Sequence, residues 1–322
     1  MVSHLILWGI AFLFLWLAEV GYFKIATRYH IVDKPNERSS HARLIIRGGG
    51  IIFPVSIIAW HFSSSFLLPW FVLAMVVAAV VSFVDDIVSV NFLVRIFFQL
   101  AAILLIFYQE SIFHYPLPVV GAALIICVGT LNAFNFMDGI NGITGVYSLV
   151  TLLSLLYVHL FVEPFTDFNL LIWVLLALIV FLFFNFRKDA RCFAGDVGSV
   201  IIALIIVFLL IQLVMATGYG WWIFLLLIYG MDSVITIVMR LSRRENIFKA
   251  HRTHLYQFFS NELRYDHRLV SVTYGAWQLI VNGVLIYSYI DHNYFLSIAA
   301  VAVSFLLYIV LRYSVVKKIT PP

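Results

Sequence analysis

Apolar stretches separated by short polar ones alternate along the whole chain. Runs of about 20 residues, the length of a helix that crosses the hydrocarbon core of a bilayer, recur from one end to the other. They cover residues 3–23, 48–65, 66–84, 93–108, 118–135, 146–162, 168–186, 197–215, 221–239, 269–290 and 294–312. The boundary inside 48–84 is the weakest of the set. The pattern predicts an all-α polytopic membrane protein, a bundle of about 11 transmembrane helices.

The composition agrees with a protein that lies in a bilayer. Of the 322 residues, 63% are hydrophobic and only 11% are charged, and the mean hydropathy is +1.03. Soluble globular proteins carry about 25% charged residues, so that class is excluded. The sequence shows no internal repeat and no low-complexity segment, and we expect residues 1–322 to form a single integral membrane domain. Cys127 lies within a run and Cys192 in a loop, so no disulfide is expected.

The basic residues predict the orientation of the bundle. Short loops rich in Lys and Arg stay on the cytoplasmic side, and threading the eleven runs from a periplasmic N-terminus places all 20 Lys and Arg residues there. The opposite loops contain only acidic charges, at Glu110, Glu163, Asp167 and Asp291. The C-terminus is then cytoplasmic, and the pI near 9.0 reflects topology rather than nucleic-acid binding. Lys24 and Arg28 follow the long first run, which indicates a retained helix rather than a signal peptide.

Four carboxylates lie at the predicted cytoplasmic ends of the spans. Asp85 and Asp86 end the third run, Asp138 ends the fifth and Asp196 begins the eighth. Ionisable groups in such places are costly unless they are paired, hydrated or bound to an ion, and carboxylate oxygens are ligands that Mg²⁺ prefers. Each carboxylate alone also fits a structural role, as a cap opposite Arg95 or as a charge at a helix N-terminus. Four on one membrane face, beside glycines and asparagines, favour a functional site.

Two single residues extend this candidate site. Arg47 stands directly before the glycine triplet 48–50, where it fits either a contact with a lipid phosphate or a snorkelling role at the membrane interface. Asn135 lies three residues before Asp138 and shares its helix face if the helix persists that far.

The loop at 241–268 places histidines among cations. His251, Arg252 and His254 fit the binding of a nucleotide diphosphate, because Arg forms bidentate contacts with phosphate. Loop cations bound to anionic lipid headgroups are the alternative. Histidine adds little charge at neutral pH, so the alternative explains the arginines of this loop better than the histidines. No third nitrogen or sulfur ligand is nearby in the sequence, so a zinc site is not expected.

Several motifs occur together between residues 33 and 257. They are Asp33 to His41 (DKPNERSSH) with Arg47 to Gly50 (RGGG), Phe83 to Asp86 (FVDD), Asn132 to Gly142 (NAFNFMDGING), Phe193 to Ser199 (FAGDVGS), Asp232 to Arg240 and His251 to Gln257 (HRTHLYQ). With these motifs the chain resembles the polyprenyl-phosphate N-acetylhexosamine-1-phosphate transferases of glycosyltransferase family 4. That family includes enzymes that initiate O-antigen synthesis and the phospho-MurNAc-pentapeptide translocase.

The resemblance implies a fold, a reaction and partners. The expected fold is a bundle of ten or eleven transmembrane helices with a cytoplasm-facing cleft, in the inner membrane of a bacterium. The expected reaction moves a sugar-1-phosphate from a UDP-N-acetylhexosamine to undecaprenyl phosphate and releases UMP, with Mg²⁺ or, in its place, Mn²⁺. Both substrates and the membrane lipids are expected partners, and nucleic acid is not. The oligomeric state stays open, a homodimer included.

The same resemblance assigns roles to residues of this chain. It implies catalytic roles for Asp85, Asp86, Asp138 and His254, with one of the paired aspartates acting as a base toward the lipid phosphate. It implies that Asp196 and Asp86 bind the metal. It implies substrate contacts for Asn135, Asn141, Arg47, His251, Arg252 and Lys188.

Departures from the family pattern favour one branch. Asn141 replaces the second Asp of the commoner Asp-Gly-x-Asp-Gly, and Tyr256 and Gln257 stand where further histidines are expected. The HRxHLYQ pattern favours enzymes that initiate O-antigen or capsule synthesis with UDP-GlcNAc, UDP-FucNAc or UDP-QuiNAc. A translocase-type transferase, a polytopic secondary transporter and a catalytically silent scaffold are the alternatives. Transporters place broken helices near the midplane of repeated halves, a pattern that this sequence lacks.

Overall fold

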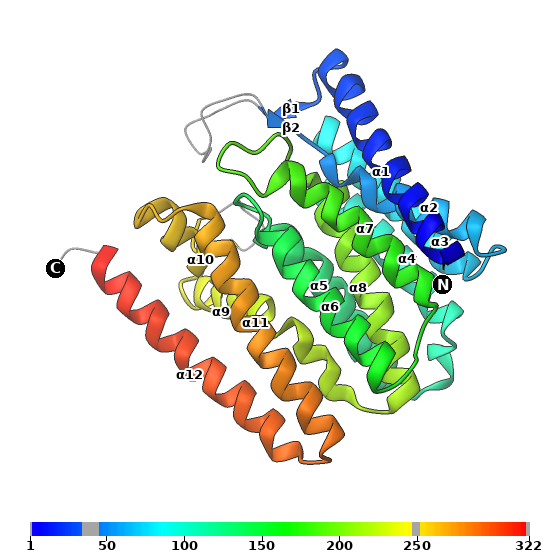
Figure 1. Ribbon diagram of the computed structural model, residues 1–322. Helices are drawn as coiled ribbons and strands as arrows, with labels where there is room; N and C mark the ends of the chain where they lie inside the picture. The colour runs from blue at the N-terminus through cyan, green and yellow to red at the C-terminus, as the bar shows by residue number, and fades with distance from the viewer. Residues whose placement is uncertain (1, 34–44, 247–251, 320–322) are drawn as a thin grey trace.

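The computed structural model describes residues 2–33, 45–246 and 252–319 (Figure 1). In chain order its elements are α1 (Val2–Arg28), β1 (Val32–Asp33), β2 (Ile45–Ile46), η1 (Gly49–Ile51), α2 (Ile52–Ser63), α3 (Pro69–Ile87), α4 (Phe92–Gln109), η2 (Ile112–His114), α5 (Leu117–Met137), α6 (Ile143–Phe161), α7 (Phe168–Asn185), α8 (Gly195–Thr217), η3 (Gly220–Leu226), α9 (Leu227–Ser242), α10 (Leu255–Gln257), η4 (Phe258–Glu262), α11 (His267–Ile290) and α12 (Tyr294–Ile319). The fold is almost entirely helical.

The long helices make the chain a multi-pass membrane protein, as predicted. Within the described ranges, ten helical segments are long and apolar enough to cross a membrane. They are Leu5–Arg28 of α1, then α3, α4, α5, α6, α7, α8, the joined segment Gly220–Ser242, α11 and α12. The second predicted run, 48–65, forms only the shorter apolar helix Gly49–Ser63. Ten long helices and one short helix therefore stand where eleven similar spans were expected.

The stretch 48–84 divides close to the predicted boundary. Ser65, Phe66 and Leu68 all have a positive φ, at 58°, 62° and 52°, which ends the helical path after α2. Pro69 then occupies the first turn of α3, where its fixed φ suits a helix and its missing N–H costs no hydrogen bond.

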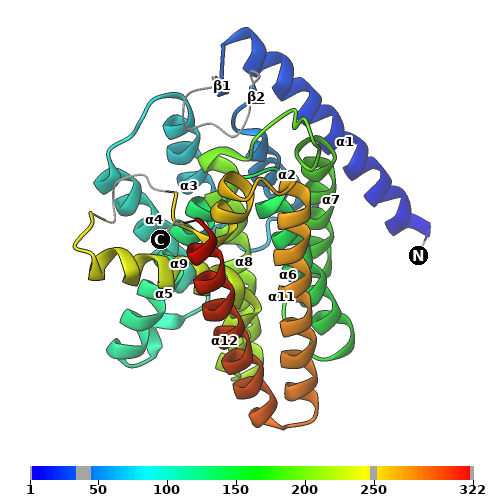
Figure 2. The same ribbon diagram turned by 90° about the vertical axis from the view of Figure 1, so that its left-hand side faces the viewer.

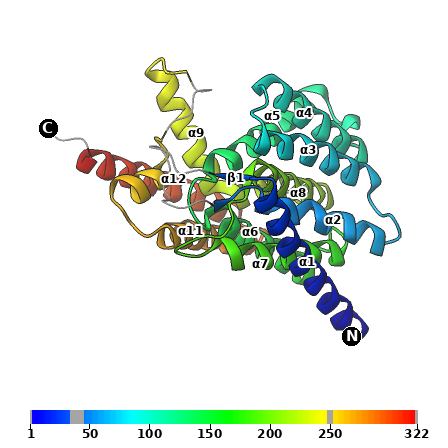
Figure 3. The ribbon, with the colours of Figure 1, turned by 90° about the horizontal axis from the view of Figure 1, so that it is seen from above.

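Most helices run side by side, and α8 lies in the middle of the bundle. Nearly all of α8 is buried, and it packs against α3 and α5. Figure 2 shows that α9 runs crosswise to the vertical helices around it. In the view from above, α12 and the N-terminal end of α1 lie at opposite ends of the molecule (Figure 3).

A two-stranded antiparallel sheet leads into the site. Val32 pairs with Ile46 and Asp33 with Ile45, and Ile46 also forms a parallel bridge with Cys192, just before α8. These pairings bring the end of α1 and the start of α2 to the N-terminal end of α8.

Candidate active site

The segment before α2 lies against the segment before α8. Two N–H groups of the glycine triplet 48–50 donate to carbonyls of residues 191–194, at 2.8 and 3.0 Å. A Cβ added at Gly198 would lie 2.8 Å from the Cα of Gly50, so only glycine permits this approach of two backbones. This close contact between the two segments places Arg47, the residue before the triplet, beside the N-terminus of α8.

Asp86, near the end of α3, caps α8 from a neighbouring helix. Its Oδ1 accepts the backbone N–H of Asp196 at 2.8 Å, and its Oδ2 accepts that of Val197 at 3.0 Å. Arg47 Nε donates to the same Oδ1 at 2.8 Å. The first N–H groups of a helix lack intrahelical partners and form the positive end of its dipole. The buried Asp86 carboxylate therefore has a structural role, because it caps the N-terminus of α8.

Arg95, near the start of α4, joins the other two carboxylates. Its Nη1 donates to Asp85 Oδ2 at 2.8 Å and to Asp196 Oδ2 at 3.1 Å. The second oxygen of Asp196 accepts Asn135 Nδ2 at 2.9 Å and lies 3.9 Å from an amino group of Arg47. Three carboxyl groups and two guanidinium groups thus form one connected network.

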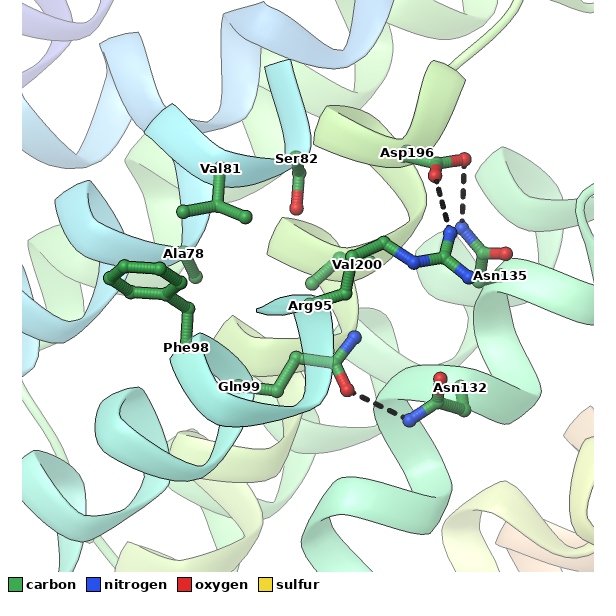
Figure 4. Close-up of a pocket in the computed structure, with 10 residues that line it drawn as sticks. All are labelled: Ala78, Val81, Ser82, Arg95, Phe98, Gln99, Asn132, Asn135, Asp196 and Val200. Atoms are coloured by element: carbon green, nitrogen blue, oxygen red, sulfur yellow. Dashed lines mark hydrogen bonds and ion pairs between the residues drawn. The ribbon is translucent and has the colours of Figure 1, made fainter. Parts of the chain in front are cut away.

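A pocket lies beside this network, between α3, α4, α5 and α8 (Figure 4). On its charged side, Arg95 and Asn135 both point at Asp196. On another side, Asn132 Nδ2 donates to Gln99 Oε1 at 2.8 Å. The remaining lining residues are Ala78, Val81, Ser82, Phe98 and Val200. The pocket therefore joins a charged group of side chains to a largely apolar wall.

Asp138 follows the last residue of α5, outside the membrane-spanning segment. Burial raises the pKa of its carboxyl to about 7; the negative charge of Asp86 adds to the rise and the positive charge of Arg47 opposes it. Asp138 is therefore close enough to the network to sense two of its members, although it forms no ion pair within the described residues. Near neutral pH its carboxyl is poised between the protonated and ionised forms.

His254 is held by a buried carboxylate on α9. Its Nδ1 lies 3.2 Å from Asp232 Oδ1, and the two side chains are 2% and 0% exposed. The backbone N–H of His254 donates to Gln257 Oε1 at 3.2 Å. Asp232 also accepts hydrogen bonds from the hydroxyl groups of Tyr274 on α11 and Tyr308 on α12.

Tyr256 connects the His254 segment to the end of α5. Its hydroxyl donates to the carbonyl of Phe136 at 3.0 Å, and a Cβ added at Gly139 would lie 3.1 Å from its ring. Tyr256 and Gln257, the residues that depart from the histidine-rich pattern, both make hydrogen bonds that fix this segment.

The remaining predicted substrate residues have different surroundings. Asn141 is buried, and its Nδ2 donates to the carbonyls of Arg187 and Lys188 at 2.9 and 3.2 Å. The Lys188 and Arg252 side chains are exposed and can meet a ligand from solution. His251 lies outside the described residues. A contact between substrate and any of these four stays a prediction.

Some of the carboxylate oxygens in this network are suitable ligands for a hard divalent cation such as Mg²⁺. No group of three or more His, Cys, Asp or Glu side chains in the described ranges is arranged to hold a metal ion. Mg²⁺ needs less, because it is usually held by one or two carboxylates together with substrate phosphates and water. Asp85 and Asp196 accept from the same Arg95 nitrogen, so their oxygens lie close together. The chemistry of this pair fits Mg²⁺, whereas both oxygens of Asp86 already accept backbone N–H groups.

Two residues of the site, Arg95 and Gln99, are not among those that the sequence motifs indicate. Arg95 is expected only to lie opposite Asp85 and Asp86, but it bridges helices α3 and α8. Gln99 lines the pocket and accepts a hydrogen bond from Asn132. A signal was present, since Arg95 and Gln99 are four residues apart on an otherwise apolar helix and so share one face.

Comparison with protein families gives a match over the middle of the chain. Residues 68–214 match the family model described as Glycosyl transferase family 4. The matched range runs from α3 to α8 and contains Asp85, Asp86, Asp138 and Asp196. No curated protein matches the chain. The family match supports a phospho-sugar transferase that acts on polyprenyl phosphate and a sugar nucleotide in a membrane.

Proposed function

We propose that this protein transfers N-acetylhexosamine-1-phosphate from a UDP-sugar of the GlcNAc, FucNAc or QuiNAc type to undecaprenyl phosphate. The reaction releases UMP and starts an O-antigen or related surface polysaccharide at the bacterial inner membrane. The convergence of Asp85, Asp86 and Asp196 with Arg47 and Arg95 at the N-terminus of α8 carries the proposal.

The proposed step is a displacement at phosphorus. An oxygen of the lipid phosphate attacks the β-phosphorus of the UDP-sugar, a new P–O bond forms, and the bond from that phosphorus to the bridging oxygen breaks. UMP leaves with the bridging oxygen and its electron pair. Phosphoryl transfer of this kind depends on positioning and on neutralisation of charge more than on covalent help from the protein.

The network explains which groups neutralise that charge. A free helix N-terminus is an anion site, but Asp86 already occupies the first N–H groups of α8. We therefore assign the binding of the phosphates to side-chain cations together with a metal ion. Arg47 and Arg95 are 38% and 31% exposed at their side chains, so each can reach a ligand without leaving the network.

Mg²⁺ is the proposed cofactor, with Mn²⁺ as a substitute. We assign it to Asp196, with Asp86 from the family pattern and Asp85 from the geometry as its neighbours. When bound, the metal would supply positive charge to the diphosphate. The lipid phosphate is already anionic, so a base role for Asp85 is optional. An Asp85→Asn variant whose rate with the lipid phosphate matches wild type across pH would remove that role.

A direct assay tests the proposal. Purified protein in detergent is given undecaprenyl phosphate, Mg²⁺ and, in turn, UDP-GlcNAc, UDP-FucNAc and UDP-QuiNAc, and released UMP is measured with the lipid product. We expect UMP and a lipid-diphosphate sugar with at least one of these donors. Absence of both with every donor would refute the proposed function.

A further inference from the structure

Asp232 is a buried carboxylate on α9 that accepts hydrogen bonds from α11, from α12 and from the segment that begins α10. Its oxygens accept from Tyr274 of α11 at 2.7 Å and from Tyr308 of α12 at 3.1 Å. They also accept two backbone N–H groups of α10, at 3.1 and 3.4 Å, besides the ring of His254. A carboxylate with no exposed surface keeps such a place only when it is fully hydrogen-bonded.

The bond between Asp232 and His254 selects one form of the imidazole. A carboxylate oxygen only accepts, so Nδ1 of His254 must carry the proton in the 3.2 Å contact with Asp232 Oδ1. In the neutral ring, Nε2 is then the acceptor nitrogen. In a neutral imidazole, the hydrogen bond that one ring nitrogen makes determines which of the two nitrogens carries the proton.

Arg312 supplies the counter-charge from the last helix. It is 5% exposed, and its Nη1 lies 3.9 Å from Asp232 Oδ1 and donates to Tyr308 at 2.8 Å and to Thr236 at 3.0 Å. Its Nη2 donates to the carbonyl of Thr253 at 2.7 Å, directly before His254. α12 is an apolar helix at the edge of the bundle (Figure 1), and little of it is buried. Near its C-terminal end, however, Arg312 contacts the segment around His254.

We propose that Asp232 and Arg312 are positioning residues for His254, and that α12 is thereby part of the active site. The pair holds the segment 253–256 against α9, and Tyr256 carries that placement to the end of α5 through the Phe136 carbonyl. His254 is presented with its Nδ1 protonated and its Nε2 as an acceptor. This inference rests on the proposed function for the role of His254, but the placement of the ring can be measured separately.

The ring form of His254 is measured first, in the wild-type protein. ¹⁵N-histidine labelling gives a nitrogen spectrum of the 10 histidines in detergent, and a His254→Asn variant identifies the signals of His254. We expect a protonated Nδ1 and an unprotonated Nε2. A protonated Nε2 with a bare Nδ1 would overturn the inference whatever the activity of the protein.

Variants then test the positioning role in the UMP assay. Asp232→Asn leaves one acceptor oxygen in place of two, and we expect kcat to fall about 10- to 100-fold, by analogy with the partners that orient metal-bound histidines. KM for undecaprenyl phosphate should stay within about 2-fold, because the charged network around Arg95 is untouched. A kcat within about 2-fold of wild type would overturn the inference.

Arg312 gives a second variant pair in case Asp232→Asn does not fold. Arg312→Gln should lower kcat, and Arg312→Lys, which keeps the charge, should restore most of it. Equal loss in both would show that Arg312 only supports the fold and would overturn its positioning role. Arg268→Gln is the matched control, because Arg268 is exposed and pairs only locally with Asp266; it should keep wild-type kcat. A wild-type protein that releases no UMP refutes the proposed function, while the ¹⁵N spectrum still decides the placement of His254.

Discussion

In the proposed site, Arg95 would compete with Mg²⁺ for the oxygens of Asp85 and Asp196. Its Nη1 contacts both carboxylates, and the side chain is about one-third exposed. A partly exposed ion pair contributes up to about 1 kcal/mol, and 1.4 kcal/mol corresponds to about 10-fold in affinity. If Mg²⁺ binds there as proposed, it would have to displace this ion pair, and the lost contact would weaken its apparent affinity.

This competition predicts the metal dependence of an Arg95 variant. Arg95→Gln should lower the Mg²⁺ concentration for half-maximal activity about 3- to 10-fold, while the maximal rate falls because a cation for the phosphates is lost. Titration of UMP release with Mg²⁺ measures both quantities. An unchanged or higher Mg²⁺ requirement would contradict the assignment of Asp85 and Asp196, and Arg268→Gln serves as the control with an exposed arginine.

Asp138 predicts a pH dependence of stability. Because burial raises its pKa from 3.8 to about 7, the folded protein holds a proton in that interval that the unfolded chain has lost. The free energy of unfolding therefore falls as pH rises through this interval. Asp138→Asn removes the effect, so its melting temperature should exceed that of wild type by a margin that grows from about pH 5 to about pH 8. A constant margin across that range would show that Asp138 is ionised throughout.

At the scale of elements, the contact between the start of α2 and α8 positions the site. Arg47 reaches Asp86 only because the glycine triplet 48–50 lies against residues 191–194 and Gly198. Gly48 and Gly195 both have a positive φ, of 74° and 72°, on either side of this contact. The two glycine-rich motifs are therefore parts of one joint between helices.

A glycine substitution tests this joint. A Cβ at Gly198 would lie 2.8 Å from both Ala194 Cβ and Gly50 Cα, so Gly198→Ala should force the segments apart. We expect a loss of about 1–3 kcal/mol in stability, as for other overpacked sites, and a fall in UMP release as Arg47 moves from Asp86. Gly283→Ala in α11 is the control, because a Cβ there meets nothing within 4 Å; it should be neutral or stabilising. Equal stability of the two variants in thermal unfolding would argue against the joint.

The apolar pattern of the sequence predicts the positions of the helices well. It does not predict which polar side chains meet between helices. The run at 168–186 became α7 at Phe168–Asn185, and 294–312 lies within α12 at Tyr294–Ile319. Helix length and hydropathy are local properties, so one sequence suffices for them. Asp232, in contrast, finds His254 and Tyr308, which are 22 and 76 residues away in the chain. Such partners depend on how helices pack, which spacing alone does not reveal.

At the scale of the whole molecule, the distribution of charge predicts which end of the bundle faces the cytoplasm. All 20 Lys and Arg residues fall on one side when the chain is threaded through eleven crossings. The site network lies at the ends of α3 and α5 and the start of α8. The predicted orientation turns the site toward the cytoplasm, the compartment that contains UDP-sugars.

Reporter fusions test the orientation. A reporter active only in the cytoplasm should work at the C-terminal end of the chain and after residue 188, and fail at the N-terminal end and after residue 165. Both native cysteines are buried, so labelling of single cysteines added at the same places has little background; a reagent that cannot cross the membrane should label the 165 site and not the 188 site. Labelling of the 188 site from the outside would contradict the predicted topology and the access of the site to nucleotide.

Asp196 is the central residue of the proposed active site, because it contacts Arg95 and Asn135 and lies at the N-terminus of α8. The decisive measurement is UMP release from the preferred UDP-N-acetylhexosamine with undecaprenyl phosphate and Mg²⁺, for wild type, Asp196→Asn and the exposed control Asp291→Asn. We expect a fall of about 100-fold or more for Asp196→Asn, as when a transition-state contact is removed, and no change for Asp291→Asn. Release by Asp196→Asn at the wild-type rate would contradict the assignment of the site.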